Sequence, residues 1–337
     1  MNVDIRTSWD IPTFDNEPVY GQGRQKEDFG TREELIVKVA AIGQRQRWTK
    51  QAMADHIGLS EGIFSGWFSR KYKGRFDTSN KKIETWLDGF EEAQDVEFAL
   101  PDSPAFIETK IATEIMDMLQ AARVLPAMNL ITADAGIGKT MAAEHFMANN
   151  SNTWMVTISP HTKTIHGMLL AIADAVGLVQ PNMAHLVTGI GKRVQKRSAP
   201  CLLIVDEAQN LTDDAINQLR HFTDQYKCGI ALLGNKESYS RFAAWGKGTK
   251  YGQLSRRILK RLNKSTSYEE DLKAFIRAWG ITDPKMTTYL IGIGKKSGAM
   301  GQIDMTIKLA NLMIMDEGRP INLADVKRAW SNRDVEG

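Results

Sequence analysis

Hydrophobic positions change their spacing twice along the chain, and each change separates segments of different predicted structure. Between residues 31 and 93, apolar residues such as Leu35 and Val39 recur at the three- to four-residue spacing of a helix face. Residues 105–262 alternate helical segments with short apolar runs, whereas residues 263–337 have helical spacing only. The pattern predicts a small helical domain, a three-layer α/β domain with a parallel sheet, and a helical C-terminal domain.

Four apolar runs of strand length lie within the predicted α/β domain. Helical segments separate these runs from one another, which favours parallel strands joined by crossover helices. The runs are Met128–Ala133, Thr153–Ser159, Cys201–Asp206 and Gly229–Leu233.

Two further segments have no hydrophobic period. Residues 1–30 contain prolines and glycines without an apolar repeat, which predicts a flexible N-terminal arm. Thr31, followed by Arg-Glu-Glu, is typical of an N-cap with a carboxylate three residues later, so we expect the first helix to begin there. Residues 94–104 include Pro101 and Pro104 and predict a linker between the helical and α/β domains.

The composition excludes several classes of protein. The chain has 337 residues, 42% of them hydrophobic, and a formal net charge of +3. No apolar run approaches the roughly 18–20 residues that a membrane helix needs, and the N-terminus lacks the apolar region of a secretory signal. Cys201 and Cys228 are unclustered in the sequence, which excludes a disulfide framework and a four-cysteine zinc site. We expect a cytoplasmic protein with no membrane segment.

The most informative motif is the segment ADAGIGKT at residues 133–140, between an apolar strand and a helical segment. This context is typical of a phosphate-binding P-loop, in which glycines let backbone N–H groups surround the phosphates. Lys139 is placed for the β- and γ-phosphates, and the Thr140 hydroxyl for Mg²⁺. Ala133 stands where the first glycine is usual, and a glycine-rich turn is the alternative interpretation. The expected nucleotide-binding residues are Ala133, Asp134, Ala135, Gly136, Ile137, Gly138, Lys139, Thr140 and Met141.

A second motif is the apolar run at residues 202–205, which ends in the adjacent carboxylates Asp206 and Glu207. Alone, such a pair is more often the surface end of a strand than a catalytic site. After a P-loop, Asp206 is expected to hold Mg²⁺ together with Thr140, and Glu207 to polarise the attacking water. The two motifs together predict an ATPase that uses ATP and Mg²⁺.

Three further positions resemble those of AAA+ P-loop ATPases. Asn235, at the tip of the strand between the two motif strands, resembles the sensor-1 residue, although a plain Gly-Asn turn is the alternative. Arg256 or Arg257 is the candidate arginine finger, which acts on the nucleotide of a neighbouring subunit. The helical tail resembles the AAA+ lid domain, but the expected sensor-2 arginine is missing from residues 298–304.

Residues 49–68 have the spacing of a helix-turn-helix. Ala54 is the small residue of the first helix, Gly58 lies in the turn, and Phe64 and Trp67 are the expected core positions of the second helix. We interpret the segment as a DNA-binding motif. A protein-binding three-helix module and a solvated charged helix end are the alternatives.

Residues at three places are expected to contact DNA, and the basic cluster before the Asp-Glu strand is expected to neutralise phosphates without reading bases. One group lies in and after the second helix of the helix-turn-helix, another precedes the Asp-Glu strand, and a single lysine follows the second strand. These candidates are Ser65, Arg70, Lys71, Lys73 and Arg75; Lys192, Arg193 and Lys196; and Lys163.

The whole arrangement over residues 31–337 resembles the Mu B family of transposition ATPases. The P-loop, the continuation DEAQN at residues 206–210 and the N-terminal helix-turn-helix carry the resemblance. It implies an ATP-dependent protein that binds double-stranded DNA with little sequence preference and assembles with itself as a helical filament. It also implies that the protein delivers target DNA to a DDE transposase, stimulates strand transfer and contributes to target immunity.

Two other functions remain open at this point. A helicase loader or replication initiator would also be an AAA+ ATPase, but the chain has no basic winged-helix module after the lid. An operator-specific regulator would use the nucleotide only as a switch, and the placement of Glu207 for water activation argues against that.

Overall fold

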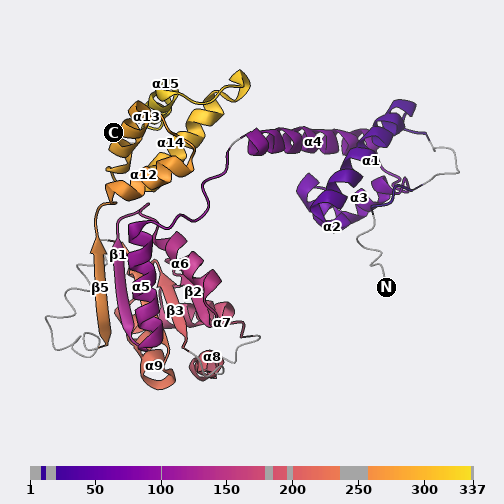
Figure 1. Ribbon diagram of the computed structural model, residues 1–337. Helices are drawn as coiled ribbons and strands as arrows, with labels where there is room; N and C mark the ends of the chain where they lie inside the picture. The colour runs from indigo at the N-terminus through magenta and orange to yellow at the C-terminus, as the bar shows by residue number, and fades with distance from the viewer. Residues whose placement is uncertain are drawn as a thin grey trace. The chain divides into compact units, whose positions relative to one another are not determined.

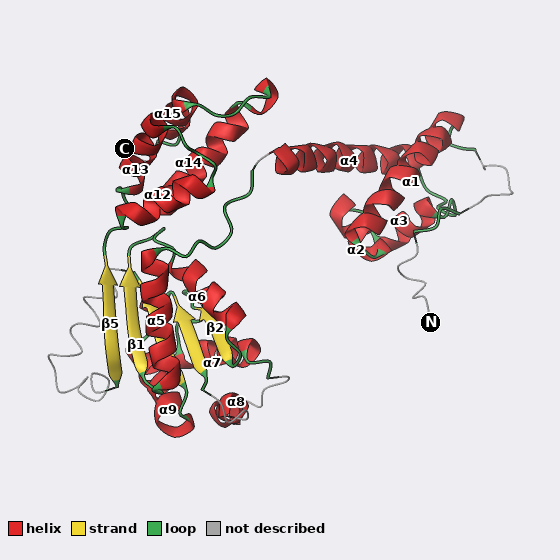
Figure 2. Ribbon diagram, viewed as in Figure 1, coloured by secondary structure: helices red, strands yellow, loops and turns green. Residues whose placement is uncertain are grey.

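The computed structural model describes two units, which are treated separately below. The division falls between residues 100 and 101, so the first unit is Met1–Leu100 and the second is Pro101–Gly337. The described residues are 9–12, 20–99, 101–178, 185–195, 200–235 and 257–334. Figures 1 and 2 show the helices of the first unit, and the sheet and helices of the second.

The first unit is built from helices packed around an aromatic core. Phe64, Trp67 and Phe68 of one short helix are fully buried there. Buried Arg32 donates to the backbone carbonyls of Trp67 and Phe68, and burial lowers the pKa of its guanidinium to about 10. The helices are α1 (Lys26–Gln46), α2 (Lys50–Ile57), α3 (Glu61–Phe68) and α4 (Phe76–Ala99).

The pair α2 and α3 occupies the segment in which we predict a helix-turn-helix. Thr49 caps α2, Gly58 ends it in the left-handed region at φ 77°, and Ser60 caps α3. Ala54 is fully buried, as are the two core positions of α3. The two helices are therefore present, and their interpretation as a DNA-binding motif stays a prediction.

Two helix ends differ from the sequence prediction. Helix α1 begins at Lys26 and not at Thr31, because Gln25 and Asp28 form a reciprocal capping box one turn earlier. Helix α4 continues to Ala99, so the predicted linker 94–104 begins with helical residues. Residues 94–99 contain neither proline nor glycine, and the first breaker of a helix is Pro101.

Part of the predicted N-terminal arm, residues 1–30, is folded onto the helices. Trp9 is buried in the aromatic core, and its indole N–H donates to the Trp48 carbonyl. Its ring also meets Phe64 and Phe68 edge-on. An isolated tryptophan has no periodic signal, which is why a pattern-based prediction treats it as part of a flexible segment.

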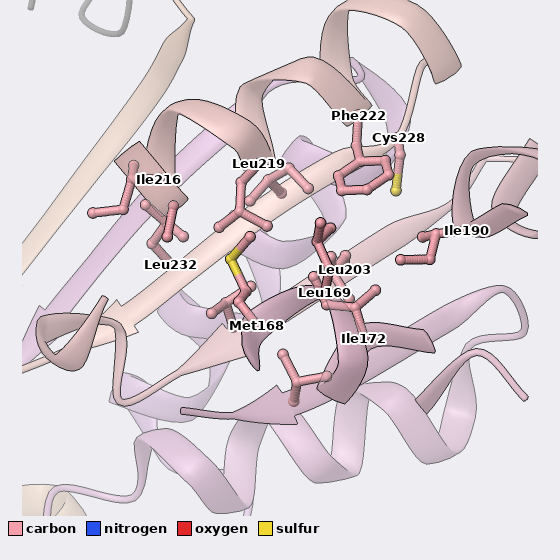
Figure 3. Close-up of a cluster of buried hydrophobic side chains, with 14 of the residues drawn as sticks. Met168, Leu169, Ile172, Ile190, Leu203, Ile216, Leu219, Phe222, Cys228 and Leu232 are labelled. Carbon is pink, nitrogen blue, oxygen red and sulfur yellow. The ribbon is translucent and has the colours of Figure 1, made fainter. Parts of the chain in front are cut away.

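The second unit contains a parallel sheet with strand order β2-β3-β4-β1-β5. The alternation along β3 shows why helices cover both faces, since Leu203 and Val205 belong to one hydrophobic cluster and Leu202 and Ile204 to the other. Figure 3 shows part of the first cluster. The strands are β1 (Met128–Ala133), β2 (Thr153–Thr157), β3 (Leu202–Asp206), β4 (Gly229–Gly234) and β5 (Ile258–Lys264).

Helices join and cover the strands, which confirms the predicted three-layer α/β class. The first cluster packs under α7, α8 and α9, and the second under α5 and α6. The helices are α5 (Lys110–Val124), α6 (Lys139–Asn149), α7 (Ile165–Ala175), α8 (Leu186–Gln195) and α9 (Asp213–Tyr226), with a short 3₁₀ turn η3 (Ala208–Asn210).

Strand β5 is the one strand among the described residues that the sequence pattern misses. It is an edge strand with the sequence ILKRLNK, in which Lys260 and Arg261 are exposed and Lys264 is half-buried. It therefore has no apolar run to recognise, and the predicted domain boundary at residue 262 falls inside it. Basic side chains are a common way to prevent an edge strand from pairing with another chain.

The two cysteines, which are unclustered in the sequence, are neighbours in space. Cys201 precedes β3 and Cys228 precedes β4, and the Gly229 N–H donates to the Cys201 carbonyl. Both thiols are buried and donate to backbone carbonyls, Cys201 to Lys227 and Cys228 to Gly229. The interaction between the two thiols lowers the pKa of Cys201 and raises that of Cys228. The pairing of β3 with β4 creates this proximity.

The C-terminal helices form a lid that follows β5. Asp271 of the lid is buried and accepts hydrogen bonds from the backbone N–H groups of Lys110 and Ile111, so it caps the start of α5. No helix in the described ranges is long and apolar enough to cross a membrane. The lid elements are α12 (Glu269–Ala278), α13 (Pro284–Gly294), α14 (Ala299–Met313), η5 (Met315–Glu317) and α15 (Leu323–Asn332).

Candidate nucleotide site

The loop between β1 and α6 lies at the carboxyl edge of the sheet. Gly136 and Gly138 have φ values of 75° and 99°, in the region that favours glycine, and Gly138 is the N-cap of α6. A Cβ on Gly136 would lie 1.8 Å from the Gly298 carbonyl oxygen, so this position accepts only glycine. The loop and the first turn of α6 together present backbone N–H groups to an anion.

Lys139 lies over this loop. Its ammonium donates to the carbonyls of Ala133 and of Asp134, the latter at 3.0 Å. Burial lowers the pKa of Lys139, while the carboxylates of Asp206 and Glu207 oppose that shift. The ammonium is therefore held where it can exchange carbonyl oxygens for phosphate oxygens.

Thr140 and Asp206 come together although they lie on different elements. The Thr140 hydroxyl donates to Asp206 Oδ2 over 2.8 Å, and Asp206 Oδ1 accepts from the Glu207 N–H at 2.8 Å. Asp206 is only 2% exposed. A hydroxyl and a carboxylate are the oxygen ligands that Mg²⁺ uses beside nucleotide phosphates, so this donor set fits the predicted ion.

Glu207 and Asn235 follow β3 and β4, and Gln209 links them. The Gln209 amide donates to Glu207 Oε2, and its Oε1 accepts from the Asn235 N–H at 3.4 Å. Strand β4 lies between β1 and β3, so Asn235 follows the strand between the two motif strands, and its sensor-1 role stays a prediction. Sequence reasoning missed Gln209 as a site residue, although it belongs to the DEAQN segment.

A cavity of about 540 Å³ extends from the P-loop toward the lid. One wall is the segment 103–107, which leads into α5, and another is formed by Phe275, Met300 and Asp304 of the lid. The sequence prediction places residues 103 and 104 in a linker and gives this wall no role. Its parts are about 200 positions apart, so no local motif could have identified them.

The lid contacts the P-loop through backbone atoms. The Met300 N–H at the start of α14 donates to the Gly136 carbonyl at 3.1 Å. This is the segment where an AAA+ sensor-2 arginine is expected, and the chain has Gly298, Met300 and Gly301 there instead. The lid therefore closes on the loop without a cationic side chain from residues 298–304.

The candidate arginine finger is not part of this site. Arg257 precedes β5 at the amino edge of the sheet, opposite the P-loop, and its Nε lies 2.6 Å from Asp224 Oδ1. Arg256 lies outside the described residues. The finger role of Arg256 or Arg257 stays a prediction.

The DNA-contact candidates of the first unit differ in availability. Ser65, Lys71 and Lys73 are exposed. Arg70 instead pairs with Glu33, and Arg75 with Asp77. In this group Lys71 and Lys73 are therefore the better phosphate candidates.

The candidates of the second unit lie on two elements. Lys163 is exposed in the loop after β2, and Lys192 is exposed on α8. Arg193 is engaged through its Nε, which donates to the Val176 carbonyl at 2.8 Å. Lys196 lies outside the described residues. The DNA contacts of both units stay predictions.

The parallel sheet, the P-loop and the Thr140–Asp206 pair define an AAA+ P-loop ATPase. A model of the AAA domain matches residues 125–242, and one described as Mu B transposition protein, C terminal, matches residues 256–332. The chain is similar to Mu B transposition proteins.

Two relatives extend the match over most of the chain. The chain is 25% identical to the ATP-dependent target DNA activator B of Escherichia phage Mu, over 87% of this chain and 93% of that protein. It is 27% identical to the Mu-like prophage FluMu DNA transposition protein B of Haemophilus influenzae, over 82% and 96% of the two chains.

Solved structures agree with the fold class. The Orc1 protein of Aeropyrum pernix, solved in complex with DNA, matches with a TM-score of 0.53 at 15% identity, over 70% of this chain and 68% of that chain. Cdc6p from Pyrobaculum aerophilum matches with a TM-score of 0.52 at 13% identity, over 70% of each chain. At these identities the likeness concerns the fold alone.

Proposed function

We propose that this chain is an ATP-dependent target DNA activator. It binds double-stranded DNA with little sequence preference, assembles with itself as a filament, delivers the DNA to a DDE transposase and stimulates strand transfer. The observation that carries the proposal is the match over 87% of the chain to a protein named for target DNA activation. A nucleotide site with the expected contacts supports the ATP dependence.

Different residues of the site have different roles in ATP hydrolysis. Lys139 and the N–H groups of the P-loop bind the phosphates, and Thr140 with Asp206 would hold Mg²⁺, which would neutralise phosphate charge. Glu207 polarises the attacking water, and Gln209 orients the Glu207 carboxylate. A neighbouring subunit supplies Arg256 or Arg257, so that ATP lies between two copies of the chain.

Shared ATP sites couple assembly to the nucleotide. If each ATP is bound by two subunits, ATP favours assembly and assembly favours ATP binding by the same factor. DNA phosphates that contact basic residues of several subunits add to this coupling. Hydrolysis then releases the filament from the DNA.

Random-sequence duplex DNA tests this proposal directly. Binding is measured with ATP, with ADP and without nucleotide, and the complexes are imaged by negative-stain microscopy. ATP-dependent filaments on any duplex, together with faster strand transfer by the cognate transposase, are the expected result. Discrete rings or binding to single strands would identify a loader instead, and binding to one sequence would identify a regulator.

Gln209→Ala is expected to reduce kcat for ATP hydrolysis about tenfold with little change in KM, because the carboxylate of Glu207 loses the amide that orients it. Steady-state kinetics with Mg²⁺ and DNA measures both constants. Gln225→Ala removes an exposed glutamine of α9 and serves as the matched control. An unchanged kcat in Gln209→Ala would show that Glu207 needs no such support.

Reversing the charge of Arg256 and Arg257 together is expected to leave ATP binding by the isolated chain unchanged. DNA-stimulated turnover should fall to the rate measured without DNA, because stimulation needs a finger from the next subunit. Asp224→Asn is the matched control, since it releases Arg257 from its ion pair and keeps the guanidinium. Wild-type stimulation in the double variant would remove both arginines from the finger role.

A further inference from the structure

Asp304 lines the nucleotide cavity, and its two carboxylate oxygens differ in their contacts. Its Oδ2 accepts from the Ser103 hydroxyl at 3.1 Å and lies 3.3 Å from the Lys308 ammonium. Its Oδ1 is buried and has no hydrogen-bond partner among the described residues. A buried acceptor without a donor costs free energy, so a ligand that supplies the donor gains affinity.

The position of Asp304 fixes which part of a nucleotide it meets. Helix α14 begins at the P-loop, where the Met300 N–H contacts the Gly136 carbonyl. Asp304 is one helical turn further along the same face, away from the phosphates. Around it the cavity is lined by the apolar segment 104–107 and by Phe275. A largely apolar wall with a few polar groups is typical of a site for a flat base.

We propose that Asp304 selects adenine by accepting a hydrogen bond from the amino group at C6 of the base. The inference rests on the proposed assignment of this cavity to ATP. A carboxylate oxygen can only accept, and hypoxanthine has a carbonyl at C6, which would repel it. Guanine offers two adjacent donors that suit both oxygens of a carboxylate, and the Ser103 contact leaves only one. Asp304 thus makes the ATPase selective for the base.

The test compares the wild type and two variants of Asp304 for their binding of ATP and of two nucleotides altered at C6. Equilibrium binding of Mg²⁺-nucleotides to the full chain is measured for ATP and for purine riboside triphosphate, which lacks the amino group. Wild type is expected to prefer ATP by about tenfold or more, since a site built for a donor rejects the analogue without it. In Asp304→Ala the preference falls to about twofold or less, chiefly through weaker ATP binding.

Asp304→Asn covers the case in which the alanine variant does not fold. It keeps the volume, and its amide can donate to the C6 carbonyl of inosine triphosphate. The preference for ATP over inosine triphosphate should therefore fall by about tenfold relative to wild type. Asp316→Ala removes an exposed carboxylate of the lid outside the cavity, and this control should keep both preferences.

Specific outcomes overturn the inference. An unchanged ratio of ATP to purine riboside triphosphate in Asp304→Ala would show that the carboxylate does not read C6. If wild type binds 2′-deoxy-ATP more weakly than ATP and Asp304→Ala does not, the contact lies on the ribose. If Asp304→Ala loses affinity for GTP and not for ATP, the contact lies on guanine. Absence of ATP binding by the wild-type chain would instead overturn the proposed function, so the two failures are distinguishable.

Discussion

Lys139→Ala is expected to abolish ATP-dependent DNA binding. Lys139 carries the positive charge that the P-loop presents to the β- and γ-phosphates, and its ammonium is already held at the loop by the carbonyls of Ala133 and Asp134. Loss of two charge-assisted hydrogen bonds from this ammonium to phosphate oxygens, each of about 1.5–3 kcal/mol, lowers the affinity for ATP on the order of 100-fold or more. Nucleotide titration and duplex binding at fixed salt measure the two consequences.

The control for this variant is Lys285→Ala, which removes an exposed lysine of α13 outside the nucleotide cavity. It keeps the change in net charge and should leave both affinities unchanged. Thermal unfolding of the two variants checks that each is folded. Full ATP-dependent DNA binding by Lys139→Ala would contradict the proposed coupling between the nucleotide and the DNA.

The parts of the site that could be predicted from the sequence are those encoded by short, contiguous segments. A P-loop needs glycines, Lys and Thr at fixed spacing, so residues 133–140 identify it without knowledge of the fold. The carboxylate Asp206 ends a buried strand, and parallel strands end at one edge of the sheet. The contact between Thr140 and Asp206 therefore follows from two local patterns and one topological rule.

The remaining parts depend on chain topology or on isolated side chains. The contact between Ser103 and Asp304 joins residues 201 positions apart, and no spacing rule spans that separation. Strand β5 is exposed and basic because it lies at the edge of the sheet, so it lacks the apolar run by which buried strands are recognised. Trp9 packs into the aromatic core as a single residue without a periodic pattern.

The docking of the lid illustrates the same limit. The sequence indicates that residues 298–304 contain no arginine, which leaves no cationic sensor from that segment. It does not indicate that the same segment meets the P-loop through the Met300 N–H and a close approach of Gly298 to Gly136. Backbone contacts need no particular side chain, so their only sign in the sequence is the small residues at the point of contact.

Glu207→Gln is expected to separate ATP binding from hydrolysis. Glutamine has the size of glutamate and can still accept from the Gln209 amide, so the site keeps its shape. It cannot take a proton from water, and loss of a general base costs about 10²–10⁴-fold in rate. ATP affinity should stay within about twofold, since uniform binding does not depend on this group. Single-turnover hydrolysis and nucleotide titration measure the two quantities.

The consequence for DNA follows from the linkage between nucleotide and assembly. If hydrolysis releases the filament, Glu207→Gln should form filaments with ATP as wild type does and should dissociate from DNA far more slowly. Glu144→Gln changes an exposed carboxylate of α6 in the same way and should leave the lifetime unchanged. Rapid dissociation of Glu207→Gln from DNA in the presence of ATP would mean that release precedes hydrolysis. Hydrolysis would then return the released protein to its starting state and would not be the step that removes it from the target DNA.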